Sequence, residues 1–221
     1  MDDFQTQIDK MRASLSDHLL PQVADSYKGN WIVDVGSNVG TFIDSALQLF
    51  PDATILAFEP VSMYYQYTID RFKNLDNVYI ENLALSDKNG TADIFVASEN
   101  IGWNTMVEEM VDGDNAHNLE TIKTTSFDLY LDYAGLVDVV VDIIKIDTEG
   151  YEYKVIRGMR RFLERQKPAI LCEIGWGKQH PFWNEELVTF DYLFGLGYKV
   201  KNNIDIESLE GTQDVVFIYE G

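Results

Sequence analysis

The stretch IVDVGSNVGTF, from Ile32 to Phe42, joins four strand-like residues to an amphipathic segment through a turn that contains two glycines. Glycine takes positive φ angles without a Cβ clash, so Gly36 and Gly40 indicate a turn where the backbone comes close to another group. The free N–H groups of a helix beginning at Thr41 would face the same place. The stretch therefore predicts a strand, a ligand-facing turn and a helix. We expect a side chain at Gly36 to fill space that the ligand needs.

Strand-like runs rich in β-branched and apolar residues alternate with helical or polar sequence along the chain. They lie at residues 31–35, 53–59, 77–83, 141–147 and 168–174. This alternation predicts an α/β fold with a mostly parallel sheet and helices on both faces. Apolar residues also recur at helical spacing between residues 149 and 166, which predicts one surface helix there.

Two pairs of runs depart from the alternation. Residues 91–97 and 121–127 interrupt it and predict an antiparallel addition or insertion. The C-terminal runs at residues 197–203 and 214–220 are joined by a polar loop. They predict a closing antiparallel pair of strands.

The chain length allows one sizeable core, because 46% of its 221 residues are hydrophobic. No Pro/Gly/Ser-rich linker divides it. We therefore expect a single domain over residues 1–221, with an N-terminal helical segment at 1–30 and the core at 31–221.

The charge of the chain is strongly negative. Its 17 Lys and Arg residues against 37 Asp and Glu residues give a formal charge of −20 at pH 7. A phosphate-binding surface requires the opposite sign, so we expect no nucleic-acid partner. The N-terminus lacks the basic and apolar regions of a signal peptide, and no run approaches the roughly 18 apolar residues of a membrane span. We expect a cytoplasmic protein with no membrane span.

Polar residues stand at the ends of the predicted core strands. Four strands end in or next to an acid, at Asp34, Glu59, Asp147 and Glu173, and the third strand ends at Asn82. Ligands of open α/β sheets bind outside the carboxyl ends of the strands, which predicts a site at this edge. Acids also cap helix N-termini, and that explains any single one of them equally well. The apolar flanks of Asp34 and Asp147 favour a site, because a buried carboxylate needs a partner.

The glycine spacing narrows the choice of ligand. G-x-x-x-G differs from the dinucleotide pattern G-x-G-x-x-G and lacks the Lys of a phosphate-binding loop, so we expect no phosphate cradle. Asp34 precedes the turn and would repel a pyrophosphate but suit an ammonium group. Glu59 ends the next strand, where it can accept two hydrogen bonds from a ribose. An amino acid joined to a nucleoside satisfies both residues, which predicts S-adenosylmethionine as the cofactor.

Five motifs follow one another over residues 31 to 175: VDVGSNVGTF, AFEP, NLALSD, IIKIDTEGYEYKVIRG and PAILCEI. Together they resemble the FkbM-type S-adenosylmethionine-dependent methyltransferases, and the block KIDTEGYE is the most specific part. The resemblance implies a Rossmann-like class I methyltransferase fold with seven strands, the last of them antiparallel. It also implies transfer of a methyl group to a hydroxyl oxygen of a sugar, glycolipid or natural product. The expected partner is thus a small-molecule or glycan acceptor.

The resemblance further implies roles for individual residues. The methionine part of the cofactor would be held by Asp34, Gly36, Ser37, Asn38 and Gly40. Glu59 would bind the ribose, and Asn82 and Ala84 would lie beside the adenine. Many class I enzymes have an acid where this chain has Ala84, so backbone groups or Asp87 would have to bind the adenine amine.

Methyl transfer to a hydroxyl needs positioning, exclusion of water and one base within hydrogen-bond reach. Asp147, Glu149 and Glu173 are candidates for the base, and so is His180 if its Trp-rich loop folds over the cleft. Alternatively, Glu149 starts a helix and His180 is an exposed loop residue. The three carboxylates would also suit Mg²⁺, but no ligand spacing requires a metal and we expect none.

Two other functional classes remain open. A nicotinamide-dependent dehydrogenase would share the fold and the acid after the second strand, but it would show the closer G-x-G spacing. A domain that merely binds S-adenosylmethionine would share both the fold and the cofactor loop, because these features do not prove turnover. Formation of S-adenosylhomocysteine in the presence of an acceptor would distinguish an enzyme from such a binding module.

Overall fold

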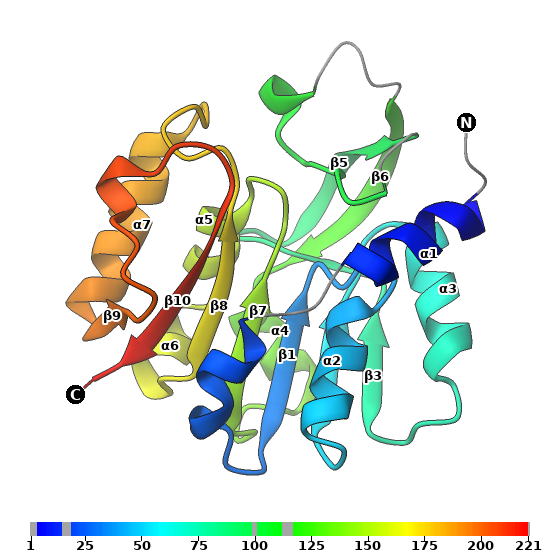
Figure 1. Ribbon diagram of the computed structural model, residues 1–221, viewed down its shortest axis with the longest axis horizontal. Coiled ribbons are helices and arrows are strands. Elements are labelled where there is room, and N and C mark those ends of the chain that lie inside the picture. The colour runs from blue at the N-terminus through cyan, green and yellow to red at the C-terminus, as the bar shows by residue number, and fades with distance from the viewer. Residues whose placement is uncertain (1–3, 15–18, 99–100, 112–116, 221) are drawn as a thin grey trace.

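The computed structural model describes residues 4–14, 19–98, 101–111 and 117–220. A seven-stranded sheet forms its centre, with the strand order β3-β2-β1-β7-β8-β10-β9 (Figure 1). In that order the strands are Val78–Glu81, Thr54–Phe58, Trp31–Val35, Val141–Ile146, Ala169–Ile174, Gln213–Tyr219 and Tyr198–Val200. β10 runs antiparallel to both of its neighbours, and the other neighbouring pairs are parallel. This arrangement confirms the predicted mostly parallel sheet with an antiparallel last strand.

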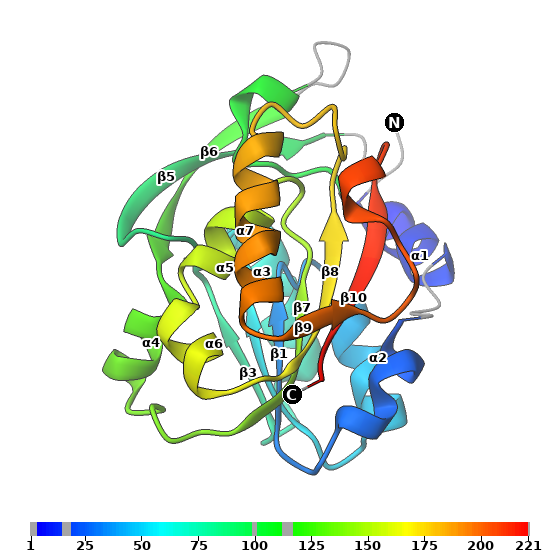
Figure 2. The same cartoon turned by 90° about the vertical axis from the view of Figure 1, so that its left-hand side faces the viewer.

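Helices cover both faces of the sheet, as predicted (Figure 2). They are α1 (Phe4–Ser14), η1 (Leu20–Ser26), α2 (Thr41–Leu49), α3 (Ser62–Phe72), α4 (Phe127–Ala134), α5 (Glu152–Arg157), α6 (Arg160–Arg165), α7 (Trp183–Gly195) and η3 (Ile206–Ser208). Successive side chains of a strand point to opposite faces, so β1 contributes to two apolar cores. Val33 packs in the core formed with α4 to α7, and Ile32 packs in the core formed with η1 and α2.

The strand order reverses at β1, which has β2 on one side and β7 on the other. From β1 the chain continues through β2 to β3, and it later crosses back to build β7 and β8. The crevice outside the carboxyl ends of the strands at such a reversal is where open α/β sheets bind ligands. Gly36 and Asp147, which directly follow β1 and β7, therefore lie at the same crevice.

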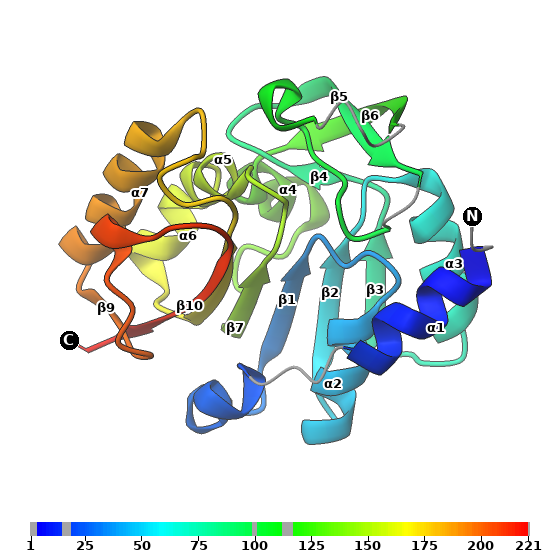
Figure 3. The same cartoon turned by 45° about the horizontal axis from the view of Figure 1, so that its top comes forward.

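A second sheet of three strands, in the order β4-β6-β5, stands beyond the carboxyl ends of β1, β2 and β3 (Figure 3). Its strands are β4 (Ala84–Leu85), β5 (Gly90–Ala97) and β6 (His117–Thr125), and η2 (Glu108–Met110) lies between β5 and β6. The antiparallel pairing of β5 with β6 confirms the predicted addition, although β6 begins earlier than residue 121. We call residues 101–107 the cover segment. A third apolar cluster joins this region to α1 and α3 and includes Ile8, Tyr64 and Ile101.

The single helix expected between residues 149 and 166 is wrong, because the structure has two short helices there, α5 and α6. The chain bends at Gly158, whose carbonyl accepts the N–H of Asp128 at 3.1 Å. A Cβ at Gly158 would lie 2.0 Å from the carbonyl oxygen of Ser86, so the chain is pressed against its neighbour at this point. The apolar spacing continues across the bend because both helices bury the same side against the sheet.

No helix in the described ranges combines the length and the apolar character that a membrane crossing requires.

Candidate active site

A cavity of about 550 Å³ opens at the carboxyl ends of β1, β2 and β7, within the range of roughly 300–1,000 Å³ typical of ligand pockets. The predicted site residues that line it are Gly36, Ser37, Asn38, Glu59, Ala84, Asp147, Glu149 and Glu173. Within the described part of the chain, the lining does not include Asp34, Gly40, Asn82 or His180. Gln7 of α1 and Trp103 of the cover segment also line the cavity.

Gly36 brings the end of β1 against the end of β7. Its φ is +82°, and a Cβ at this place would lie 1.9 Å from the carbonyl oxygen of Asp147. The N–H of Asp147 donates to the carbonyl of Val35 at 3.0 Å in the same contact. The group that the turn approaches is therefore the neighbouring loop of the protein itself. The expectation that a side chain at Gly36 would first fill ligand space is wrong, because it would strike backbone.

Gly40 has a packing reason of its own. Its φ is +79°, and a Cβ there would lie 2.6 Å from the ring of Phe72 and 3.1 Å from the side chain of Thr68, both in α3. This glycine lets α3 pack against the start of α2. Any contribution of Gly40 to cofactor binding would be indirect.

Glu59 is buried at the end of β2, with 4% of its surface exposed, and its carboxylate faces the cavity. One carboxylate oxygen accepts the N–H of Asn38 at 2.7 Å, and the other accepts the N–H of Val61 at 2.8 Å. Burial raises the pKa of Glu59 to about 8, although the two N–H donors act in the opposite direction. Asn82 lies behind this residue, and its side-chain amide donates to the Glu59 carbonyl at 3.0 Å.

The turn after β1 presents polar groups next to Glu59. Ser37 lines the cavity, and its hydroxyl is buried and has no hydrogen-bond partner among the described residues. Asn38 has a φ of +47°, which is uncommon for a residue with a side chain. Its side-chain amide donates to the carbonyl of Ile101 at 2.6 Å, so the turn is tied to the cover segment.

Lys145 lies between two acids. Its Nζ is 2.8 Å from Oδ2 of Asp147 and 3.8 Å from Oδ1 of Asp34, which is fully buried. Asp34 and Lys145 are paired across β1 and β7, so their side chains share one face of the sheet. Burial alone would raise the pKa of Asp147, but Lys145 and a hydrogen bond from Glu173 lower it overall. Asp34 thus meets a lysine of the protein where the sequence predicted a ligand ammonium group.

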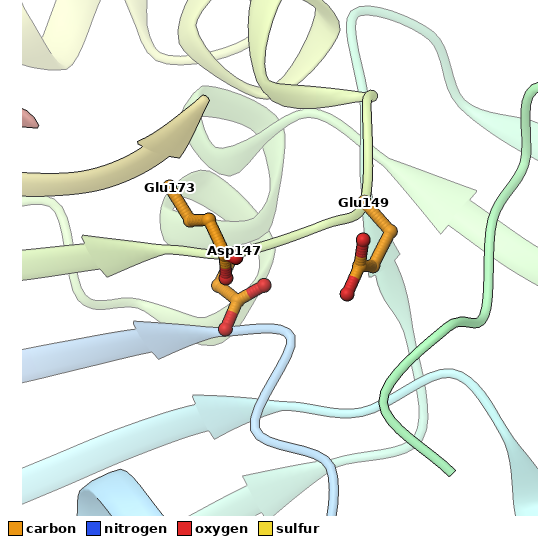
Figure 4. A group of neighbouring side chains, drawn as sticks. All are labelled: Asp147, Glu149 and Glu173. Atoms are coloured by element: carbon orange, nitrogen blue, oxygen red, sulfur yellow. The ribbon is translucent and has the colours of Figure 1, made fainter. Parts of the chain in front are cut away.

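Asp147, Glu149 and Glu173 converge at the cavity (Figure 4), and each offers a carboxylate oxygen within 4.8 Å of the other two. Burial raises the pKa of Glu149 to about 9 and that of Glu173 to about 10, and the charge of Asp147 adds to both shifts. Glu149 and Glu173 therefore retain protons near neutral pH. The group holds one ionised acid, two protonated acids and the ammonium of Lys145.

His180 is 3% exposed and lies outside the lining of the cavity. Its Nδ1 accepts the N–H of Phe182 at 3.0 Å, so the ring proton is on Nε2, which donates to the carbonyl of Gly150 at 2.8 Å. Burial lowers the pKa of this histidine, which keeps the ring neutral. Both nitrogens are thus engaged by the protein backbone, an arrangement that disfavours His180 as the base. The alternative prediction, that His180 is an exposed loop residue, is also wrong, because the side chain is buried.

The model of the methyltransferase FkbM domain matches residues 34–200, which include both cavity loops. The chain belongs to the FkbM methyltransferase family. Members of this family use S-adenosylmethionine, and the match decides against the nicotinamide-dependent alternative.

Two known methyltransferases are similar to this chain over part of their length. "Methyltransferase 1" of Beauveria bassiana (strain ARSEF 2860) is 26% identical over 146 residues, which are 59% of this chain and 58% of that protein. The crystal structure of an FkbM methyltransferase from Methylobacillus flagellatus KT superimposes with a TM-score of 0.54 at 14% identity, over 86% of this chain and 44% of that one. The chain thus spans little more than half of the first relative and less than half of the second.

The likeness in fold extends beyond the FkbM family. Fibrillarin of Aeropyrum pernix, solved with natively bound S-adenosyl-L-methionine, gives a TM-score of 0.51 at 12% identity over 87% of this chain and 68% of that one. With the strand order β3-β2-β1-β7-β8-β10-β9, this establishes the class I methyltransferase fold.

The FkbM-family site also contains residues that the sequence prediction did not select. Lys145 could have been found, because it is a basic residue in the mostly apolar strand VDIIKI, two positions before Asp147. Trp103 had no such signal, because it lies in a segment without helical or strand periodicity. Glu152 was not selected either; it begins α5, is completely buried and accepts hydrogen bonds from the loop that carries Asp147 and Glu149.

Proposed function

We propose that this FkbM-family chain transfers a methyl group from S-adenosylmethionine to a hydroxyl oxygen of a sugar, glycolipid or natural product. The observation that carries the proposal is the shared cavity. A buried carboxylate, Glu59, lies at the end of β2, and the three acids of Figure 4 lie at the ends of β7 and β8. Such a cavity offers hydrogen-bond acceptors for a ribose at one end and a candidate base at the other.

The residues present suit S-adenosylmethionine. Glu59 has capacity for hydrogen bonds beyond the two it accepts from the backbone, since a carboxylate has about four lone-pair sites. The buried hydroxyl of Ser37 offers a hydrogen bond beside the turn of Gly36 and Asn38, where the methionine part would lie. Ala84 would lie against the adenine. Asp34 is covered by Lys145, so Asp147 is better placed than Asp34 to meet the amino group of the cofactor.

Asp147 and Glu149 have different roles in the proposed reaction. When bound, the cofactor supplies an electrophilic methyl group on a sulfonium centre. Asp147 has a lowered pKa and stays ionised, so it suits orientation of a cation or of the acceptor hydroxyl. Burial raises the pKa of Glu149 to about 9, above that of Asp147, so its carboxylate has the higher affinity for a proton. The positive charge of the bound cofactor favours the ionised form of Glu149, which can accept that proton. Glu149 therefore takes the acceptor proton, and the cavity walls exclude water.

The lining of the cavity limits the charge of the acceptor. Four acids, Glu59, Asp147, Glu149 and Glu173, line it together with one lysine, and two acids already surround that lysine. An acceptor that carries a phosphate or carboxylate would meet carboxyl groups without a free cation to pair with. Trp103 is 49% exposed and lines the cavity, so it offers a flat apolar surface to a sugar ring. Uncharged or cationic hydroxyl compounds fit best.

The proposal is tested in two steps. Calorimetry first measures S-adenosylmethionine binding. A panel of uncharged glycosides and natural-product scaffolds is then screened by mass spectrometry for the gain of one CH₂ unit together with S-adenosylhomocysteine. Cofactor binding without turnover on any acceptor would favour the binding module instead. Absence of cofactor binding would remove both.

A further inference from the structure

The loop from Asp147 to Tyr151 has an unusual backbone. Glu149 has a φ of +52°, and Gly150, next in the chain, has a φ of +93°. A left-handed conformation is uncommon for a residue with a Cβ and persists where the surrounding structure holds it. This backbone carries the carboxylate of Glu149 toward Asp147 (Figure 4). The contacts that hold the loop therefore determine where Glu149 lies.

Glu152, the first residue of α5, holds the loop from the side of the sheet. It is fully buried, and its Oε1 accepts three hydrogen bonds from the loop. The donors are the N–H of Thr148 at 2.9 Å, the hydroxyl of Thr148 at 2.7 Å and the N–H of Gly150 at 3.2 Å. One oxygen atom thus fixes the residues on both sides of Glu149.

Thr105 of the cover segment holds the same loop from the opposite side. It is 6% exposed, and its hydroxyl donates to the carbonyl oxygen of Glu149 at 2.7 Å. Its own backbone exchanges two hydrogen bonds with Phe95 of β5, at 2.9 and 3.2 Å, so the hydroxyl is anchored to the second sheet. The imidazole of His180 adds a third contact, on the carbonyl of Gly150.

We propose that Glu152 and Thr105 are positioning residues that clamp the backbone of Glu149 between the start of α5 and the cover segment and so place its carboxylate for proton transfer. The inference rests on the proposed function, because it assigns Glu149 a part in the reaction. Neither residue is placed at the reacting atoms. The cover segment also accepts a hydrogen bond from the side chain of Asn38 at the carbonyl of Ile101. The same segment therefore contacts both the turn after β1 and the loop that carries Glu149.

The first test compares Thr105→Val, Thr105→Ser and Thr189→Val. Thr189 is a matched control, because it is also buried and its hydroxyl also donates to a backbone carbonyl, that of Glu185 at 2.8 Å, but in α7. With a verified acceptor, we expect Thr105→Val to lower kcat roughly tenfold or more while the Kd for S-adenosylmethionine changes less than about threefold. Thr105→Ser retains the hydroxyl and should restore kcat, and Thr189→Val should leave kcat unchanged.

The second test uses Glu152→Leu and Glu152→Gln. Glutamine keeps a carbonyl oxygen for the three donors and resembles the protonated acid, which burial favours at this place. Leucine removes the acceptor. We expect amide hydrogen exchange at Thr148 and Gly150 to accelerate in Glu152→Leu and in Thr105→Val, and to stay slow in Glu152→Gln. If Glu152→Leu does not fold, the Thr105 pair decides the proposal.

The outcomes separate this inference from the proposed function. Full kcat in Thr105→Val, or unchanged amide exchange in the variants that lose the contacts, would overturn the clamp. Failure of the wild-type chain to methylate any acceptor would overturn the proposed function. In that case amide exchange, which needs neither cofactor nor acceptor, still decides whether the two contacts hold the loop.

Discussion

Glu59 is fixed by the backbone on both sides of its own position in the chain. Each carboxylate oxygen accepts one N–H, from Asn38 or from Val61, and this leaves capacity that a ribose can use. The side chain is thus oriented before any ligand arrives, which reduces the entropy lost on binding.

We predict that, above pH 8 where Glu59 is ionised, Glu59→Ala weakens S-adenosylmethionine binding by about 1.5–3 kcal/mol, because two hydrogen bonds to a charged acceptor are lost. Calorimetry gives the affinity, and thermal melting shows how much of the loss comes from the two unpaired N–H groups. Glu120→Ala is the control, since Glu120 also accepts a backbone N–H at the start of α3, from Ser62 at 3.1 Å, and is not part of the described cavity lining. Unchanged cofactor affinity in Glu59→Ala would contradict the ribose assignment.

A second prediction concerns the base. Glu149→Gln should lower kcat by about 10²–10⁴-fold with little change in cofactor affinity. In the wild-type chain kcat should rise with pH as Glu149 loses its proton, at a pH below the pKa of about 9 that burial gives the cofactor-free chain, because the bound sulfonium favours the ionised form. The variant should lack this transition. Asp147→Asn should lose turnover and still bind cofactor.

We expect the substitution of His180 to have a different effect from those of Glu149 and Asp147. His180→Gln should keep the pH profile, because both nitrogens of His180 are engaged by the backbone. Full activity in the variants of Glu149, Asp147 and His180 alike, each with a verified acceptor, would leave a mechanism based on positioning alone.

The position of Glu59 at the carboxyl edge of the sheet was predictable, because strand and helix alternate regularly on both sides of it. The partner of Asp34 was not. Asp34 and Lys145 are more than a hundred residues apart in the chain, and their contact depends on the register between β1 and β7. A local pattern carries no information about such a register.

Among the secondary-structure elements, β1 and β7 are in close backbone contact at their carboxyl ends. A Cβ at Gly36 would lie 1.9 Å from the carbonyl of Asp147, so the two loops meet with no room for a side chain. The sequence indicated a close approach at this glycine correctly. It did not show what is approached, because that group, the carbonyl of Asp147, is distant from Gly36 in the sequence.

This contact gives a prediction for Gly36→Ala. Gly29→Ala is the matched control, since Gly29 also has a positive φ, of +89°, but a Cβ there would meet nothing within 4 Å. The control should lose about 1–2 kcal/mol of folding free energy for the backbone conformation alone. Gly36→Ala should lose at least about twice as much and also weaken S-adenosylmethionine binding, as measured by chemical denaturation and calorimetry. Equal losses of folding free energy in the two variants would show that the backbone around Asp147 can move to accept a side chain at Gly36.

The sequence also did not predict that the segment between residues 149 and 166 forms two short helices, α5 and α6. Their apolar residues follow one helical spacing, which correctly indicated a buried side but gave no sign of the bend at Gly158. At the bend Gly158 lies against Ser86 and Asp128, which are distant from it in the sequence. The cover segment lacked any periodic pattern, so its contacts with Asn38 and Glu149 were beyond sequence reasoning.

At the scale of the whole molecule, buried acids accompany a formal charge of −20 at pH 7. Glu59, Glu149 and Glu173 have pKa values raised to about 8, 9 and 10 from an ordinary value near 4.5, with burial as the main cause. Between the two values the folded chain holds more protons than the unfolded chain. The stability that these groups contribute is complete below their unfolded pKa and is lost as pH rises through the folded pKa.

We therefore predict that the cofactor-free chain melts at a lower temperature as pH rises from about 6 to 9. Asp147 has the opposite sign, but its lowered pKa acts below its ordinary value of 3.8, outside this range. Added salt should recover part of the loss by screening the general negative charge. A melting temperature that rises over the same pH range would show that the acids are already ionised in the empty site.

The charge of the cavity gives a last prediction, which rests on the proposed function. Among acceptors of one scaffold, a carboxylated or phosphorylated derivative should show a kcat/KM roughly tenfold or more below that of the uncharged parent, and an amino derivative should not. The cause is that Lys145, the single lysine of the lining, already lies between Asp34 and Asp147, so an anionic group would meet carboxyl groups and no available cation. A preference for the anionic derivative would contradict the proposal.

The close contact between Gly36 and Asp147 also bears on motion. The two loops touch through their backbones and follow paired central strands, so separating them would require breaking the pairing of β1 with β7. We therefore expect any opening on the other wall, formed by α1 and the cover segment, which hold Gln7 and Trp103 at the lining. Ligand entry and product release therefore depend on that wall, and mutations there should alter residence times before they alter the chemical step.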